Sequence, residues 1–135
     1  MSQWRASIEI PIEPESASVA RNIVGHLLRG WRLSELDDDL RLITSELVTN
    51  VYQHAPDGDS IELEIIADQD RVRVSLADGS TIKPVIREMD PSTPTGRGLR
   101  LVRALSSRWG ADEYQGGKRV WVEVDLPHQA DLARE

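Results

Sequence analysis

Three polar side chains repeat at intervals of four residues near the middle of the chain. They are Glu46, Asn50 and His54, and on a helix this spacing places them on one stripe. The stripe runs beside the apolar positions Ile43 and Leu47 rather than opposite them. A polar row at the border of a buried face can look into a cleft next to the core. The same row also fits a solvated helix border.

A single carboxylate stands at the end of an alternating segment. Asp78 is followed by Gly79 and Ser80, which open an irregular stretch at 79–95 that contains three prolines. A carboxylate at a strand end can accept a hydrogen bond from an exocyclic amine such as N6 of adenine, and a glycine lets a ligand approach closely. An ordinary Asp-Gly turn explains the same residues without a ligand.

Two glycines introduce the third helical segment. In the run TGRGL, Gly96 and Gly98 flank Arg97 and are followed by Leu99. Glycines ahead of a helix expose its first N–H groups to an anion, and the helix dipole adds attraction. Arg97 could bring positive charge to phosphate oxygens. The alternative is a flexible loop that ends in a threonine N-cap, because a lone Gly-x-Gly occurs in many contexts.

The hydrophobic pattern predicts the elements that must position these residues. Alternation predicts strands, whereas apolar residues three to four apart predict helices. The expected strands are 4–12, 60–67, 71–77, 112–115 and 119–126, and the expected helices are 16–31, 34 to the turn at 55–58, and 98–109. This order predicts an α/β (α+β) two-layer sandwich, in which about three helices pack on one mixed, mostly antiparallel sheet.

Some residues have simpler structural explanations. Asp37, Asp38 and Asp39 fit the start of the second helix, where negative charge is favourable. Gly116-Gly117 fits a hairpin turn, after which Lys118 could reach a phosphate or remain in solvent. Because phenylalanine is absent, we expect an aliphatic core whose few bulky members are the tryptophans Trp4, Trp31, Trp109 and Trp121.

The overall composition narrows the class of protein. A chain of 135 residues fits one domain, 1–135, with a polar tail at 128–135. The formal charge of -7 disfavours binding to nucleic acid or to an anionic membrane. The chain has no cysteine and three scattered histidines, which argues against a disulfide framework or a zinc site. No leader or membrane-length apolar run is evident, so we expect a cytoplasmic protein.

The order and spacing of these motifs resemble the GHKL (Bergerat-fold) ATPases, also described as histidine kinase-like ATPases. The resemblance to their N box covers SELVTNVYQHA at 45–55, and the resemblance to their first glycine box covers DGS at 78–80. The second glycine box is similar to GRGLRLV at 96–102, and the last motif is similar to GGKRVW at 116–121. Two positions depart from the family pattern, namely Thr81 and Arg119.

The resemblance implies a role for each matching residue. Glu46 would be the catalytic general base, and Asn50 would ligate Mg²⁺. Asp78 would hold the adenine amine, and the backbone at 96–99, with Gly96, Arg97, Gly98 and Leu99, would cradle the phosphates of ATP. His54 and Ser80 lie within the matching motifs and would line the same ATP site.

The closest functional branch contains the anti-sigma-factor serine/threonine kinases. By this resemblance the chain would bind a sigma factor and phosphorylate a serine on an anti-sigma factor antagonist protein, and it would form a homodimer. The alternative is a regulator that binds ATP or a protein without phosphoryl transfer, which the altered residues Thr81 and Arg119 favour. A sensor histidine kinase is disfavoured, because the chain has no room for a dimerising phosphoacceptor helix pair.

Overall fold

The structure is a computed structural model that describes residues 3–54, 60–78, 97–114 and 117–127. The predicted loop at 79–95 and the predicted tail at 128–135 lie outside the described residues. In chain order the elements are β1 (Trp4–Pro11), α1 (Ser16–Gly30), the 3₁₀ helix η1 (Ser34–Leu36), α2 (Asp37–His54), β2 (Ser60–Ala67), β3 (Arg71–Asp78), α3 (Arg97–Leu105), β4 (Arg108–Tyr114) and β5 (Gly117–Asp125).

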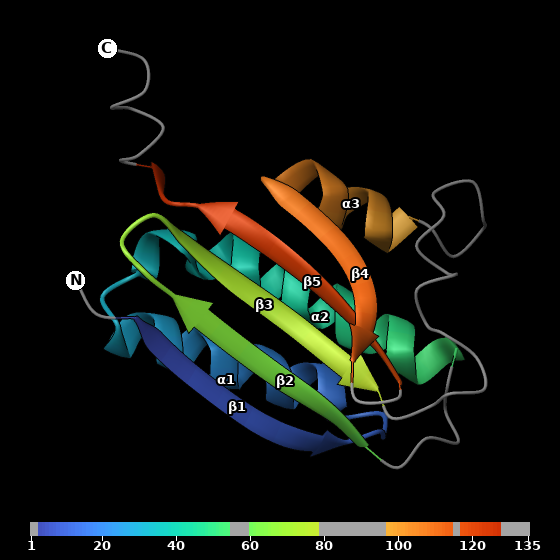
Figure 1. Cartoon of the computed structure of the whole chain (residues 1–135). Helices are drawn as coiled ribbons and strands as arrows, with labels where there is room; N and C mark the ends of the chain where they lie inside the picture. The colour runs from blue at the N-terminus through green and yellow to red at the C-terminus, as the bar shows by residue number, and fades with distance from the viewer. Residues whose placement is uncertain (1–2, 55–59, 79–96, 115–116, 128–135) are drawn as a thin grey trace.

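The strands form one sheet in the order β1-β2-β3-β5-β4, and every neighbouring pair is antiparallel. β3 and β4 run in the same direction, but β5 lies between them. Figure 1 shows all three helices behind the sheet, on one of its two faces. The predicted two-layer sandwich is therefore confirmed. None of the helices in the described ranges is long and apolar enough to cross a membrane.

The core lies between the helices and the sheet, and it is aliphatic. The alternation in β2 is complete, because residues 61, 63, 65 and 67 are buried while the residues between them are only partly covered. On α2, the apolar stripe of Leu40, Ile43 and Leu47 is 0 to 2% exposed. Each such side chain contributes about 1.5 to 3 kcal/mol when it leaves water. This burial fixes which face of α2 remains available for polar groups.

The third helix is shorter than the sequence predicts. The expected helix at 98–109 was wrong at its end, because α3 stops at Leu105 and β4 begins at Arg108. The N–H of Ser107 donates to the carbonyl of Glu123 at 2.8 Å, so the backbone changes its partner from the helix to β5. Trp109 then pairs with Val122 in the sheet. Its position four residues after Leu105 imitates helical spacing.

The expectation that the tryptophans are the bulky core members holds only in part, because Trp31 and Trp109 are partly buried and pack against the core, whereas Trp4 and Trp121 do not. Trp4 is 36% exposed and stacks on Trp31, with ring centroids 6.0 Å apart. Trp121 lies on the face of the sheet away from the helices, because its neighbours at 120 and 122 are the buried ones. There it packs over Gly110 and under the guanidinium of Arg73, 4.5 Å from its ring centroid. Trp121 therefore covers part of the sheet face that carries no helix, which we call the open face.

Candidate nucleotide-binding site

Helix α2 carries the polar stripe at the border of its buried face. The structure places Glu46, Asn50 and His54 on this one helix, with His54 as its last residue. Glu46 is half-buried, whereas Asn50 is 6% exposed. The neighbouring positions Leu47 and Val51 are in the core. Glu46 and Asn50 therefore lie at the rim of the core and not on a fully solvated face.

Asn50 is one of the few polar side chains that are buried in this fold. The buried side-chain atoms that lack a partner among the described residues are Asp37 Oδ1 and Arg41 Nε, and the amide of Asn50 is not one of them. The amide oxygen of Asn50 is of the hard type that suits Mg²⁺.

The described residues hold no cluster of three or more histidine or acidic side chains that could bind a metal ion. The amide oxygen of Asn50 fits Mg²⁺, which usually keeps few protein ligands and takes the rest from phosphates and water.

An ion pair joins α2 to α1 where the two helices approach closely. Asp37 lies 3.7 Å from Arg29 of α1 and 3.8 Å from Arg41 of its own helix. Gly25 of α1 permits the close approach, since a Cβ there would lie 3.2 Å from the Cδ of Arg41. The sequence pattern predicts for Asp37 only a role at the start of the second helix. The four-residue spacing from Asp37 to Arg41 was the signal that could have revealed this pair.

Asp78 is the last residue of β3, at one end of the sheet. In the strand register it is opposite Ile61 at the start of β2 and Lys118 at the start of β5. Figure 1 shows α2, β3 and β4 all ending on the right-hand side of the view, where β5 and α3 begin. The ends of α2 and β3 and the starts of α3 and β5 thus lie at one end of the molecule.

The start of α3 completes this end. Arg97, Gly98 and Leu99 form its first turn, and Val102 anchors the helix in the core at 1% exposure. Helix α3 contacts α2. The first N–H groups of a helix have no partner within it and attract anions. The predicted site residues Ser80 and Gly96 lie outside the described residues.

The Arg119 side chain makes its contact with Asp112 within the sheet. Its guanidinium donates two hydrogen bonds, of 3.1 and 3.0 Å, to the carboxylate of Asp112 across the β4–β5 pair. These bonds hold the pKa of the Asp112 carboxyl below its usual value. The arginine that departs from the family pattern thus stabilises the pairing of the last two strands.

The open face of the sheet carries a further charge network that the sequence analysis did not identify. Arg108 donates to Glu123 at 2.8 Å and also pairs with Asp125. The hydrogen bonds that Arg108 donates to Asp125 and, second, to Glu123 raise the pKa of Arg108 above its usual value. The sequence signal that could have indicated this network is the occurrence of opposite charges at alternate positions of the two strands. These charged groups join β4 to β5 and do not belong to the candidate nucleotide-binding site.

Comparisons with known proteins agree with this arrangement. The family model described as "Histidine kinase-like ATPase domain" matches residues 10–124. Among solved structures, the histidine kinase domain from the Erythrobacter litoralis EL346 blue-light activated histidine kinase is similar, with a TM-score of 0.52 and 23% sequence identity. The match covers 76% of this chain and 50% of that chain, so this chain spans half of that domain's length. No curated protein matches the chain.

At this identity the structural likeness concerns the fold alone, whereas the family match extends over most of the chain. Domains of this family bind ATP, generally with Mg²⁺. The motifs that converge beside α2 occur inside the matched range. This chain belongs to the family of histidine kinase-like ATPase domains.

Proposed function

We propose that the chain is an ATP-binding regulatory protein whose nucleotide lies at the end of the molecule where α2 and β3 end and α3 begins. The observation that carries this proposal is Asn50, a polar side chain that is only 6% exposed at the rim of the core, on the helix that also presents the half-buried Glu46. A ligand that reaches this rim can contact the amide of Asn50.

The proposed contacts follow the placement of the elements. Asp78 accepts a hydrogen bond from the adenine amine at the end of β3, and the first turn of α3 receives the phosphates. Asn50 holds Mg²⁺, which when bound neutralises part of the phosphate charge. His54, Ser80 and the glycine turn at 96–98 belong to the same site in this proposal.

The more specific proposal is a serine/threonine protein kinase that acts as an anti-sigma factor. Its substrate is a serine hydroxyl on an antagonist protein, and its second partner is a sigma factor. The γ-phosphoryl group moves from ATP to the serine oxygen, ADP leaves, and Glu46 accepts the hydroxyl proton. The support for Glu46 is that it is half-buried one turn before Asn50, because a base must lie near the transferred group.

One observation favours a second candidate, a regulator that binds ATP without phosphoryl transfer. Arg119 replaces a residue of the family's last motif, and its guanidinium is bound to Asp112 on the open face. A side chain held there does not serve the nucleotide. Binding and transfer therefore need separate measurements.

The experiment is a thermal-unfolding series with Mg·ATP, followed by incubation with labelled ATP and candidate antagonist proteins. Stabilisation by Mg·ATP that disappears in Asn50→Ala supports the site, and no stabilisation at millimolar nucleotide contradicts it. The exposed neighbour Gln53→Ala, on the same helix, is the matched control. Transfer of label to a serine, lost in Glu46→Gln, supports the kinase. Binding without transfer supports the second candidate.

A further inference from the structure

The shortest of the three α-helices carries a charge opposite to that of the whole chain. Between Asp90 and Asp112 the sequence contains four arginines and no acidic residue, whereas the chain has a formal charge of -7. Three of these arginines, Arg97, Arg100 and Arg103, belong to α3. Positive charge is therefore concentrated on one helix of an acidic protein, and a local asymmetry of this kind attracts a partner of opposite charge.

Helical spacing decides which part of α3 faces outward. Val102 is 1% exposed and lies in the core, so the residues two positions before and after it lie on the opposite side of the helix. These residues are Arg100 and Ala104, and both are exposed. Leu101 and Arg103 flank them and are exposed as well. We call Arg100, Leu101, Arg103 and Ala104 the α3 face.

The Arg103 side chain is oriented by an aromatic ring. Its guanidinium lies 5.6 Å from the centroid of the Trp109 ring on β4. A cation–π contact orients the guanidinium but does not neutralise it, because the ring has no net charge. Arg119, by contrast, is matched by the carboxylate of Asp112. In the part of the chain that the structure describes, Arg103 faces a ring and not a carboxylate, so its charge remains available to a partner.

Leu101 adds an apolar group to the α3 face. Its side chain is 39% exposed, although the next residue in the chain, Val102, is in the core. A single exposed leucine is common on protein surfaces, but this one lies within one turn of the exposed Arg100 and Arg103. The α3 face therefore matches a segment that places an apolar side chain next to carboxylates.

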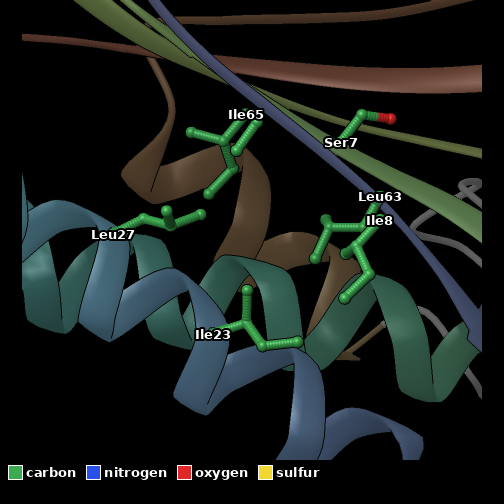
Figure 2. A pocket seen from close by; sticks show the side chains of 7 residues that line it. Ser7, Ile8, Ile23, Leu27, Leu63 and Ile65 are labelled. Atoms are coloured by element: carbon green, nitrogen blue, oxygen red, sulfur yellow. The ribbon is translucent and has the colours of Figure 1, made fainter.

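A second surface of the molecule has a different chemistry. A groove of about 210 Å³ lies between β1 and α1, and Figure 2 shows Ile8, Ile23 and Leu27 gathered in it. None of the side chains that line this groove is charged. An acidic segment would leave its carboxylates without partners there, which costs free energy. The α3 face offers both kinds of contact, and the groove provides a position for a control variant.

We propose that the α3 face docks an acidic segment of a partner protein. Carboxylates of the segment pair with Arg100 and Arg103, and an apolar side chain packs on Leu101. Because α3 begins at the nucleotide end of the molecule, the docked segment lies beside the proposed ATP site. This docking rests on the proposed function, because the segment belongs to the protein partner named there. Nucleic acids and anionic membranes are disfavoured, since their extended charge also meets the acidic remainder of the chain.

A labelled peptide tests the charge of the partner in the absence of nucleotide. The probe is a short peptide in which aspartates and glutamates surround leucines, and the matched peptide carries asparagine and glutamine at the acidic positions. In fluorescence anisotropy the acidic probe should bind at least about tenfold more tightly than its neutral counterpart. Its affinity should fall as the salt concentration rises, because salt screens exposed charges. Equal affinities for the two peptides, or no binding of either, would overturn the proposal.

Substitutions on the α3 face locate the binding site of the acidic probe. Arg103→Glu and Leu101→Asp should each raise its dissociation constant at least about tenfold, because each places a negative charge against the probe. Arg32→Glu and Val19→Asp are the matched controls, since both positions are exposed outside α3, and Val19 lies one turn before Ile23 of the groove. Their dissociation constants should stay within about twofold of the original. Equal weakening by a control variant would place the probe elsewhere and overturn the proposal.

A conservative variant separates the loss of charge from a loss of folding. Arg103→Gln keeps most of the aliphatic stem, so it should weaken binding of the probe by a smaller factor than Arg103→Glu. Thermal unfolding of each variant checks that the chain is still folded. Unchanged binding in both variants of Arg103, with the fold intact, would overturn the proposal.

The start of α3 also attracts anions, so binding to the α3 face must be separated from binding at the ATP site. Saturating Mg·ATP should leave the affinity of the probe within about threefold, whereas displacement of the probe would place it in the nucleotide site and overturn the proposal. Arg103→Glu should lose the probe but keep its stabilisation by Mg·ATP. Absence of this stabilisation in the original chain would contradict the proposed function and not the α3 face. Tighter binding of a DNA oligonucleotide or of phosphatidylserine vesicles to the same face would overturn the assignment of a protein partner.

Discussion

Arg119 on β5 holds the carboxylate of Asp112 on β4 through two hydrogen bonds, of 3.1 and 3.0 Å. This pair joins the last two strands on the face away from the helices. The contact with Asp112 gives Arg119 a structural role in the sheet. The contact also makes the stability of the fold sensitive to acid.

The first prediction concerns this acid sensitivity. The hydrogen bonds from Arg119 lower the pKa of Asp112 below its reference value of 3.8. The pair therefore stabilises the fold fully above pH 3.8, and this contribution is lost as the pH falls through the lowered pKa. Because Asp112 is 43% exposed, solvent screening limits the effect to about 0.5 kcal/mol.

Urea unfolding of Asp112→Asn and of the original chain, between pH 7 and pH 2, measures this contribution. The variant should be slightly less stable at pH 7, and the difference should shrink below pH 3.8. In an Arg119→Gln background the same substitution should show no such pH dependence. A difference that grows on acidification would show that the pair has the opposite effect.

The second prediction concerns the approach of the two long helices. A Cβ at Gly25 would meet the side chains of Arg41 and Asp37 at 3.2 to 3.3 Å. Gly25→Leu should therefore destabilise the fold by about 2 kcal/mol, because a larger side chain forces the helices apart. Gly30→Leu is the matched control on the same helix, since a Cβ there meets nothing within 4 Å. Its unfolding free energy in urea should change by less than about 0.5 kcal/mol.

The parts of the fold that could be predicted from sequence depend on local spacing. Glu46 and Asn50 are four residues apart inside an apolar pattern, so their common helix follows from periodicity alone. Trp109 shows where this reasoning fails, because it lies four residues after Leu105 and imitates the next helical turn. The hydrogen bond from Ser107 to a distant strand decides the outcome, and a local pattern cannot reveal it.

In the candidate site, too, some features follow from the local sequence pattern and others depend on the order of the strands. That Asp78 ends a strand follows from the alternation before it. That it lies opposite Lys118 depends on the strand order, in which β5 is inserted between β3 and β4. The position of Trp121 could have been inferred, because it alternates with Val120 and Val122, which are buried. The ion pairs on the open face could not be predicted from the sequence, because they depend on which residues the strand register brings together.

The third prediction concerns the glycine under Trp121. A Cβ at Gly110 would lie 2.6 Å from the indole ring, a distance that forces the ring to move. Gly110→Ala should therefore cost about 2 kcal/mol of unfolding free energy and disturb the packing of Arg73 on the ring. In a Trp121→Ala background the cost should nearly vanish, because the obstacle is gone. Equal costs in both backgrounds would assign the effect to the backbone.

The fourth prediction separates the ligand role of Asn50 from a structural one. If the amide serves only the ligand, Asn50→Ala should leave the unfolding free energy of the nucleotide-free chain nearly unchanged. Mg·ATP at one hundred times its dissociation constant should stabilise the original chain by about 2.7 kcal/mol and the variant hardly at all. A large loss of stability without nucleotide would instead make Asn50 structural.

The fifth prediction separates binding from phosphoryl transfer at Glu46. Its carboxylate is half-buried on α2, one turn before Asn50, and in our proposal it accepts the proton of the serine hydroxyl. Glu46→Gln keeps the size of the side chain but removes the base. Thermal stabilisation by Mg·ATP should therefore persist, while the rate of transfer to a serine substrate should fall by about 10² to 10⁴. Loss of both properties would mean that the carboxylate serves the nucleotide site itself, and unchanged transfer would mean that another group accepts the proton.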